Sequence, residues 1–316
     1  MGLVKLFSTV GQFKQQLHVE GAVRLSGDLL KKYQEYLLGM AEDIISVCEA
    51  EQISYHLTGG SALGAVRHGG FIPWDDDMDI DILGSDFDRF ERAFLAKFSD
   101  KYTLDTYKNH NYGILVSRVR LKNSVIRTRE DAGKDECGFF VDIIRIENTF
   151  NNPILRFMHG MDCMAMGFLL SCRNYCHNRK TALDMAGDNR KLRTVLKIKI
   201  FIGRLVSFRS LDKWAAKTQK CYSRCKNNNS VFVSVPAGRR HYFGEMYRRA
   251  DFVEAAKMNF EGHSWNVPKD YDAYLRNMYG DYRQLPAPED REEHVILEIV
   301  FPEDMGKRQD DLGQDA

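Results

Sequence analysis

One short run of the sequence restricts the fold of this chain more than any other. Within residues 74–82, Trp-Asp-Asp-Asp-Met-Asp-Ile-Asp-Ile, aspartate occupies every second position: Asp75, Asp77, Asp79 and Asp81. Side chains of a β-strand alternate between its two faces, so an extended chain would point all four carboxylates to one side. The positions between them are apolar from Met78 onward, which predicts a half-buried strand with an acidic face.

Carboxylates packed this closely repel one another and raise one another's pKa unless a cation neutralises them. Hard divalent cations are the natural partners of clustered carboxylate oxygens, so the run predicts a Mg²⁺ or Mn²⁺ site. The alternative is a solvated acidic turn, as many charge runs are. The apolar positions argue against it, because a strand that points carboxylates inward without a metal would be strongly destabilised.

A glycine-rich turn precedes the acidic run. Residues 53–57 are a short strand candidate, residues 58–61 read Thr-Gly-Gly-Ser, and residues 62–67 have a helical pattern. Adjacent glycines let the backbone approach a phosphate closely, Ser61 can cap the helix, and the free N–H groups at a helix start attract an anion. Gly59, Gly60 and Ser61 are therefore candidate phosphate-binding residues. Arg67 and His68, at the other end of this helix, are further candidates.

The longest pattern joins these two features. Residues 56–80, His-Leu-Thr-Gly-Gly-Ser-Ala-Leu-Gly-Ala-Val-Arg-His-Gly-Gly-Phe-Ile-Pro-Trp-Asp-Asp-Asp-Met-Asp-Ile, resemble the hallmark segment of the LicD family, relatives of the fukutins. Phe-Glu-Gly at 260–262, the stretch 267–286 and His294 follow in the order that this family shows. The resemblance covers residues 27–147 and 258–295. It implies a nucleotidyltransferase fold, with a Gly-Ser turn followed by Asp-x-Asp on the next strand.

The resemblance also implies an activity. LicD proteins move a phosphate-linked alcohol, such as phosphocholine, from a CDP-activated donor to a sugar of a cell-surface glycan, with release of CMP. By that pattern Asp77 and Asp79 are metal ligands and Asp75 is a third contributor. Asp81 departs from the pattern, since relatives usually have a small residue there, and Asp79-Ile-Asp81 fits Asp-x-Asp equally well. The register of the motif therefore stays open.

A third catalytic carboxylate is expected in this fold, to bind a second metal or to accept the proton of the attacking hydroxyl. Asp142 is the candidate, because it is the lone acid in the apolar run 139–146 and the family has an Asp in a similar strand. The alternative is a core ion pair with Arg145 or Arg118. Two other functions also stay open: a nucleotidylyltransferase that releases pyrophosphate, and a non-catalytic scaffold that binds glycan or membrane.

The remaining pattern predicts an α+β fold, a nucleotidyltransferase-like mixed sheet flanked by helices with the acidic strand central. Helices are expected at 28–51 and from 85 to about 98, and further strands at 102–107, 114–121, 125–128 and 139–146. We expect a catalytic core at 27–150, a helical basic insertion at 151–235, a C-terminal helical segment at 236–302 that completes the active site, and a disordered tail at 303–316.

The insertion differs in charge from the rest, since residues 171–226 hold fifteen Lys or Arg against three Asp or Glu. Its stretch 195–214 mixes apolar and basic residues, which indicates either a basic amphipathic helix on an anionic membrane that carries a lipid-linked acceptor, or a helical subdomain whose basic face is solvated or steers an anionic donor. Its cysteines at 172, 176, 221 and 225 form two pairs with helical spacing, which leaves open a zinc site or reduced, buried thiols.

Whole-chain composition agrees with a soluble enzyme. The 316 residues are 44% hydrophobic, and the formal charge of +1 gives no support to nucleic-acid binding. The sequence lacks a run of eighteen uncharged apolar residues and a secretory leader pattern at its start, and its seven scattered cysteines do not form a disulfide framework. We therefore expect a cytoplasmic protein with peripheral contact at the inner face of the membrane.

Overall fold

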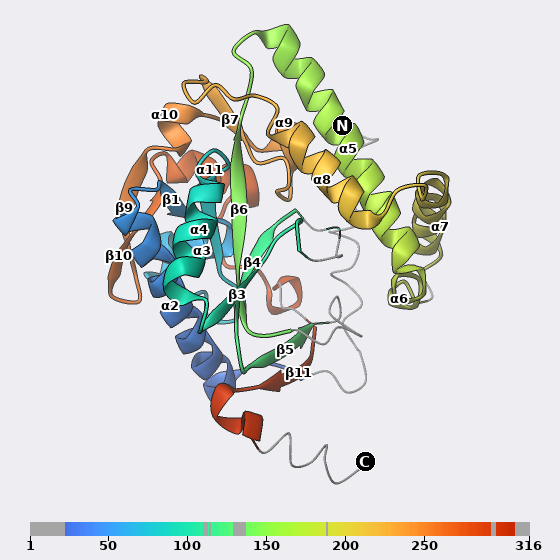
Figure 1. Ribbon diagram of the computed structural model, residues 1–316. Coiled ribbons are helices and arrows are strands. Elements are labelled where there is room, and N and C mark those ends of the chain that lie inside the picture. The colour runs from blue at the N-terminus through green and yellow to red at the C-terminus, as the bar shows by residue number, and fades with distance from the viewer. Residues whose placement is uncertain are drawn as a thin grey trace.

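The computed structural model describes residues 23–109, 113, 115–128, 137–187, 189–291 and 295–306. Its strands are β1 Tyr55–Leu57, β2 Asp79–Leu83, β3 Tyr102–Asp105, β4 Ser117–Leu121, β5 Val125–Thr128, β6 Phe140–Asn148, β7 Phe232–Ser234, β8 Met246–Arg248, β9 Ala255–Phe260, β10 His263–Pro268 and β11 Ile296–Val300. Its α-helices are α2 Gly27–Ala50, α3 Gly59–His68, α4 Phe87–Phe98, α5 Pro153–His177, α6 Arg179–Met185, α7 Arg190–Leu205, α8 Leu211–Tyr222, α9 His241–Gly244, α10 Arg249–Phe252 and α11 Tyr271–Tyr279. The predicted α+β class and the mixed, helix-flanked sheet are confirmed (Figure 1).

The centre of the main sheet is β6 rather than the acidic strand. The strand order is β1-β2-β6-β4-β3, and the end of β6 also pairs with β7, which pairs with β8. The nine residues of β6 are long enough to pair in parallel with β2, antiparallel with β4 and antiparallel with β7. The acidic strand β2 is next to the centre, between β1 and β6. It pairs with a neighbouring strand along both edges, which fixes its register.

Helix α2 covers one face of the sheet because its apolar residues recur at helical spacing. Tyr33, Leu37, Met40 and Ile44 are fully buried in the main hydrophobic core, together with Phe90 and Phe94 of α4. Helix α4 begins at Phe87, near the predicted position, and its N-cap Asp86 makes no side-chain capping bond.

The basic region is a separate layer of helices, α5 to α8, beside the sheet (Figure 1). The predicted stretch 195–214 is not one helix, since α7 ends at Leu205 and α8 begins at Leu211. The cysteine pairs are also separated: Cys172 packs against Gly203 of α7, whereas Cys221 meets His159 and Cys163 of α5. A zinc site built from the two predicted pairs is therefore not formed. Among the described residues, the helices include none that is long and apolar enough to cross a membrane.

The C-terminal segment contains more β-structure than predicted. The hairpin β9–β10 precedes α11, and β11 pairs with β5 at the far end of the molecule (Figure 1). The described chain continues through Glu303, which binds Lys32 at 2.5 Å and accepts a hydrogen bond from Tyr36 at 2.7 Å. Residues 307–316 of the predicted tail, and His294, lie outside the described residues.

Candidate active site

The acidic residues form the floor of a cleft at the start of β2. The regular strand begins at Asp79, so the preceding residues 75–78 are not the predicted extension of it. Asp75, Asp76, Asp77, Asp79 and Asp81 nevertheless all line the same cleft, whose volume is about 700 Å³. The prediction that the alternating carboxylates converge is correct, although a loop rather than a long strand brings the first of them together.

Helix α3 holds Asp79 in place through its first turn. The Ser61 hydroxyl accepts a hydrogen bond from the Asp79 amide at 3.0 Å, and the Thr58 amide donates to the Asp79 carbonyl at 3.1 Å. Ser61 is therefore not the helix cap that the sequence suggested, because α3 begins two residues earlier and its N-cap is Thr58. Its hydroxyl fixes the backbone of the acidic strand instead.

The two glycines of this turn lie directly against carboxylates. A Cβ atom on Gly59 would meet Asp79 Oδ2 at 2.7 Å, and one on Gly60 would meet Asp75 Oδ2 at 2.6 Å. Gly59 also has φ of +54°, which disfavours any other residue. Glycine is therefore needed at both positions because the Asp75 and Asp79 carboxylates approach the start of α3 closely. The helix dipole favours negative charge there.

Asp142 lies beside Asp79 on the neighbouring strand. The two residues are direct partners in the parallel pairing of β2 with β6. Asp142 Oδ1 also accepts a hydrogen bond from Arg118 Nε at 2.8 Å, which is one of the ion pairs considered from the sequence. The cleft is lined by Arg118 and not by Asp142. Asp142 therefore lies beside Asp79 and also forms the ion pair with Arg118 that was considered as the alternative. Its catalytic role stays a prediction.

The cluster needs positive charge. Burial raises the pKa of Asp79 well above its usual value, and the charges of Asp77, Asp142, Asp75 and Asp81 raise it further. Asp81 is buried, and its pKa is raised by burial and then by Glu245. A partly buried set of oxygen donors that disfavour one another's charge fits a hard divalent cation such as Mg²⁺. Asp75, Asp77, Asp79 and Asp142 could hold such an ion.

Arginines face the acidic floor. The cleft is lined by four of them: Arg67, Arg118, Arg239 and Arg291. Arg67 lines the cleft as predicted, but its Nη1 also donates to the carbonyl of Tyr282 at 2.8 Å, so it fixes the C-terminal segment as well. His68 is outside the cleft lining, and its Nδ1 accepts a hydrogen bond from Arg67 Nε at 3.4 Å.

The C-terminal segment supplies residues that the sequence did not single out. The Tyr274 hydroxyl of α11 accepts a hydrogen bond from the Gly59 amide at 2.8 Å and lies 2.6 Å from the Thr58 hydroxyl. Tyr279 also lines the cleft; burial raises its pKa, and the charges of Asp79, Asp75 and Asp77 raise it further. Glu245 is buried in the cleft wall, and burial raises its pKa to about 7. A C-terminal helical segment was expected, but the sequence did not show which of its residues would meet α3.

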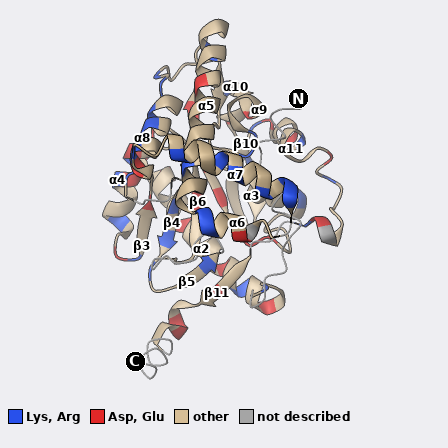
Figure 2. Ribbon diagram, turned by 90° about the vertical axis from the view of Figure 1, so that its right-hand side faces the viewer, with Lys and Arg blue, Asp and Glu red and all other residues tan. Residues whose placement is uncertain are grey.

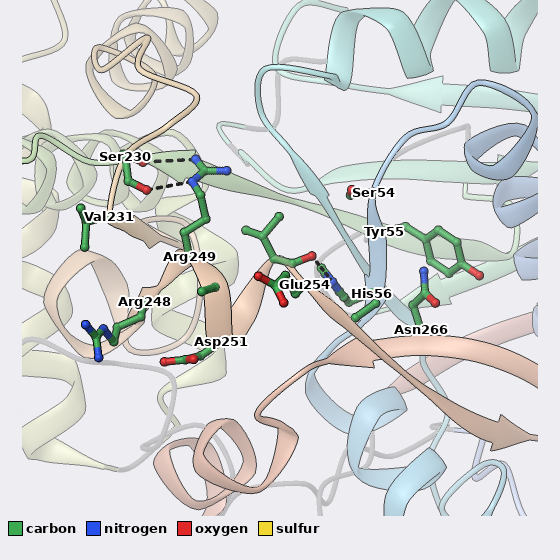
Figure 3. Close-up of a pocket in the computed structure, with 13 residues that line it drawn as sticks. Ser54, Tyr55, His56, Ser230, Val231, Arg248, Arg249, Asp251, Glu254 and Asn266 are labelled. Atoms are coloured by element: carbon green, nitrogen blue, oxygen red, sulfur yellow. Dashed lines mark hydrogen bonds between the residues drawn. The ribbon is translucent and has the colours of Figure 1, made fainter.

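A second cavity, of about 870 Å³, lies beside β1 and β10 (Figure 3). His56 Nε2 is 3.0 Å from the Val253 carbonyl there, and Arg249 donates to the carbonyl of Ser230 at 2.9 Å. This cavity shares no lining residue with the acidic cleft. It contains neither the aspartates nor the glycines of the motif, so the acidic cleft is the candidate active site.

Comparison with known proteins agrees with this geometry. Residues 52–152 match the model of the LicD/FKTN/FKRP nucleotidyltransferase domain. The lipopolysaccharide cholinephosphotransferase LicD of Haemophilus influenzae is 26% identical over 279 residues, which are 86% of this chain and 98% of the relative. The human ribitol 5-phosphate transferase FKRP is 46% identical over 52 residues, which are 16% of this chain and 10% of that protein. Residues 52–152 are therefore similar to the nucleotidyltransferase domain of the LicD family, and the similarity to the bacterial relative extends over most of the chain.

Proposed function

We propose that this protein is a LicD-type phosphotransferase, which moves a phosphate-linked alcohol from a CDP-activated donor to a sugar of a cell-surface glycan and releases CMP. The observation that carries the proposal is an acidic floor facing four arginines in one cleft. Such a site can hold a divalent cation and the phosphates that the cation binds. The relatives named for cholinephosphate and ribitol 5-phosphate transfer support the same class of donor group.

The residues of the cleft divide into two roles. Asp75, Asp77, Asp79 and Asp142 would hold one or two Mg²⁺ or Mn²⁺ ions, which when bound neutralise charge on the transferred phosphate and on the leaving nucleotide. Arg118, Arg239 and Arg291 line the same cleft and can bind the donor phosphates, and Arg118 Nε also donates to Asp142. Gly59 and Gly60 leave room at the start of α3, whose N–H groups and dipole favour anions.

A base must accept the proton of the sugar hydroxyl. Asp142 was the candidate from the sequence, but its Oδ1 already accepts a hydrogen bond from Arg118. Glu245 has a pKa near 7, raised by burial, and its carboxylate lies in the cleft wall, where the Arg240 amide donates to it at 2.6 Å. A group with that pKa can exchange a proton at neutral pH, so Glu245 is a second candidate for the base.

The test is product analysis with a panel of CDP-alcohols, with and without glycan acceptors. CMP release that needs both acceptor and Mg²⁺, and that is lost in Asp79→Asn, is the expected result. Pyrophosphate release from a nucleoside triphosphate would instead indicate the nucleotidylyltransferase. A folded protein that binds glycan but releases neither product would indicate the scaffold.

We also propose that the outer face of α7 lies on an anionic lipid surface, which would bring the cleft near a lipid-linked acceptor. On this face the apolar residues are exposed: Ile198, Phe201, Leu205 and, just beyond the helix, Phe208 are 47, 61, 65 and 73% exposed. They are spaced to form one stripe along a helix. Helix α7 also carries six Lys or Arg and no acidic residue. Figure 2 shows basic segments, in blue, along this helix. Exposed apolar groups flanked by cations are typical of helices that lie in a membrane interface.

This second proposal is tested by co-sedimentation with vesicles that contain anionic lipid. Phe201→Ser/Leu205→Ser and Lys197→Glu/Arg204→Glu should each reduce binding, and Lys31→Glu/Arg92→Glu, exposed on α2 and α4, should not. Lys199 is unsuitable for such a test because it is buried and its Nζ donates to the Ser171 hydroxyl at 3.3 Å. Equal loss of activity on a soluble acceptor would favour donor steering by the basic residues.

A further inference from the structure

A second set of metal-ligating side chains lies between α5 and α8, outside the acidic cleft. His159 and Cys163 are one helical turn apart on α5, and Cys221 is in the last turn of α8. A ring nitrogen of His159 and the two sulfur atoms all lie within 4.8 Å of one another. The three side chains are at most 6% exposed. Residues 62 positions apart in the sequence thus place an imidazole and two thiols around one point.

The histidine is held as a metal ligand is usually held. Its Nε2 is 2.8 Å from the carbonyl oxygen of Cys221, so in the tautomer with the proton on Nε2 it donates to that carbonyl. The other nitrogen, Nδ1, then carries the lone pair that a metal needs; it lies 3.5 Å from the Tyr242 hydroxyl, which can donate to it when no metal is bound. The ring packs edge-on against Phe150 and Tyr242, with centroids 5.2 and 5.3 Å away. Both neighbours restrict its rotation.

A guanidinium group lies beside one of the two thiols. Arg224 Nη2 lies 3.4 Å from Cys221 Sγ, and the same guanidinium donates to Asp162 at 2.6 Å. Thiolate and imidazole are the donors that Zn²⁺ prefers, and three protein ligands leave the fourth position of its tetrahedron to water. Hard cations such as Mg²⁺ prefer oxygen, so the two sites would select different metals.

We propose that His159, Cys163 and Cys221 bind a Zn²⁺ ion that joins α5 to α8. The hydrophobic cluster that joins these helices is much smaller than the core around the main sheet, so a metal would contribute to their packing. Tyr242, which contacts His159, lies in α9, and Arg239 and Glu245 on either side of α9 line the acidic cleft. The ion would therefore also hold one wall of the cleft. The proposal does not depend on the transfer reaction, because the two sites share no residue.

The test is the zinc content of the full-length protein, purified without chelator and measured by elemental analysis. About one zinc ion per chain is expected in the wild type, with loss in Cys163→Ser and Cys221→Ser. Cys172→Ser is the matched control, since Cys172 is an equally buried thiol on α5 that lies outside the cluster. Asp79→Asn should also keep its zinc, which separates this site from the acidic cleft.

A second measurement covers the case in which the cysteine variants fail to fold. In wild-type protein reconstituted with Co²⁺, thiolate ligands give a sulfur-to-cobalt charge-transfer band, which carboxylates do not. The wild-type thiols at 163 and 221 should become open to alkylation when a zinc chelator is added in excess Mg²⁺. A wild type without zinc or the cobalt band, zinc content unchanged in Cys163→Ser, or a disulfide between Cys163 and Cys221 in peptide mapping would each overturn the proposal.

Discussion

Gly60→Ala tests how the first turn of α3 serves the acidic site. Gly60 is in the helix, so alanine would suit its backbone, and an alanine in place of glycine stabilises a helix interior by up to about 1 kcal/mol. The new Cβ would, however, be 2.6 Å from Asp75 Oδ2, whereas ordinary contact begins at 3.4 Å. The carboxylate must therefore move by roughly 0.8 Å, the difference between those two distances.

A movement of this size matters for a metal far more than for the fold. Mg²⁺ needs near-ideal geometry with oxygen at about 2.0–2.1 Å, so Asp75 would lose its contact. We expect Gly60→Ala to weaken Mg²⁺ binding by ~10–100-fold, which is about 1.4–2.7 kcal/mol, while the melting temperature without metal changes little. Calorimetric titration of Mg²⁺ and thermal melts of the same samples measure both quantities.

The matched control is Gly39→Ala in α2, where a Cβ would have no atom within 4 Å. This variant should gain stability and bind Mg²⁺ as the wild type does. Wild-type Mg²⁺ affinity in a folded Gly60→Ala protein would refute Asp75 as a ligand. Unchanged Mg²⁺ affinity combined with weaker binding of a CDP-alcohol would instead mean that Gly60 makes room for the donor phosphate, as the sequence first suggested.

Three further predictions concern single side chains. Asp79→Asn should keep the fold and reduce transfer by ~10²-fold or more. Mg²⁺ should raise the melting temperature of this variant less than that of the wild type. Turnover above a tenth of the wild-type rate would contradict the role of Asp79 as a metal ligand. If Asp142 acts in catalysis, Asp142→Asn should lose activity beyond the loss in Arg118→Met, whereas a purely structural ion pair predicts equal destabilisation and retained turnover in both variants. Burial lowers the pKa of His56 to about 4, so the unfolded chain binds the proton first, and stability should fall as the pH drops through the window from 6.5 to 4. Urea titrations should therefore show the wild type losing about 2 kcal/mol relative to His56→Gln between pH 7 and pH 5, and a constant difference between the two proteins would contradict the burial of a neutral histidine.

The sequence predicted the elements that carry a strong local signal. The alternation of aspartate with apolar residues located the acidic strand, and the spacing of Leu37, Met40 and Ile44 located α2 within one residue of its observed bounds. Both follow from the periodicity of a single segment, which needs no knowledge of the rest of the chain. The predicted bounds of β5 were likewise correct.

Partners from distant segments could not be predicted in the same way. The ion pair between Asp142 and Arg118 was only one of two alternatives, because a lone acid in a strand does not show which strand pairs beside it. The basic stretch 195–214 was expected to bury its apolar residues or to present them to a membrane, and the sequence alone does not distinguish these cases. In the structure Leu196 and Ile200 of α7 are buried, whereas Phe201 and Leu205 are exposed.

The contact of α11 with α3 gives a physical reason why residues so far apart form one site. The Tyr274 hydroxyl accepts the hydrogen bond of the Gly59 amide, one of the free N–H groups at the start of α3. Arg67, at the other end of the same helix, donates to the Tyr282 carbonyl just beyond α11. Both ends of α3 are thus bound to the C-terminal segment, and α3 in turn fixes the backbone of Asp79 through Ser61. The position of the acidic residues therefore depends on residues about 200 positions further along the chain.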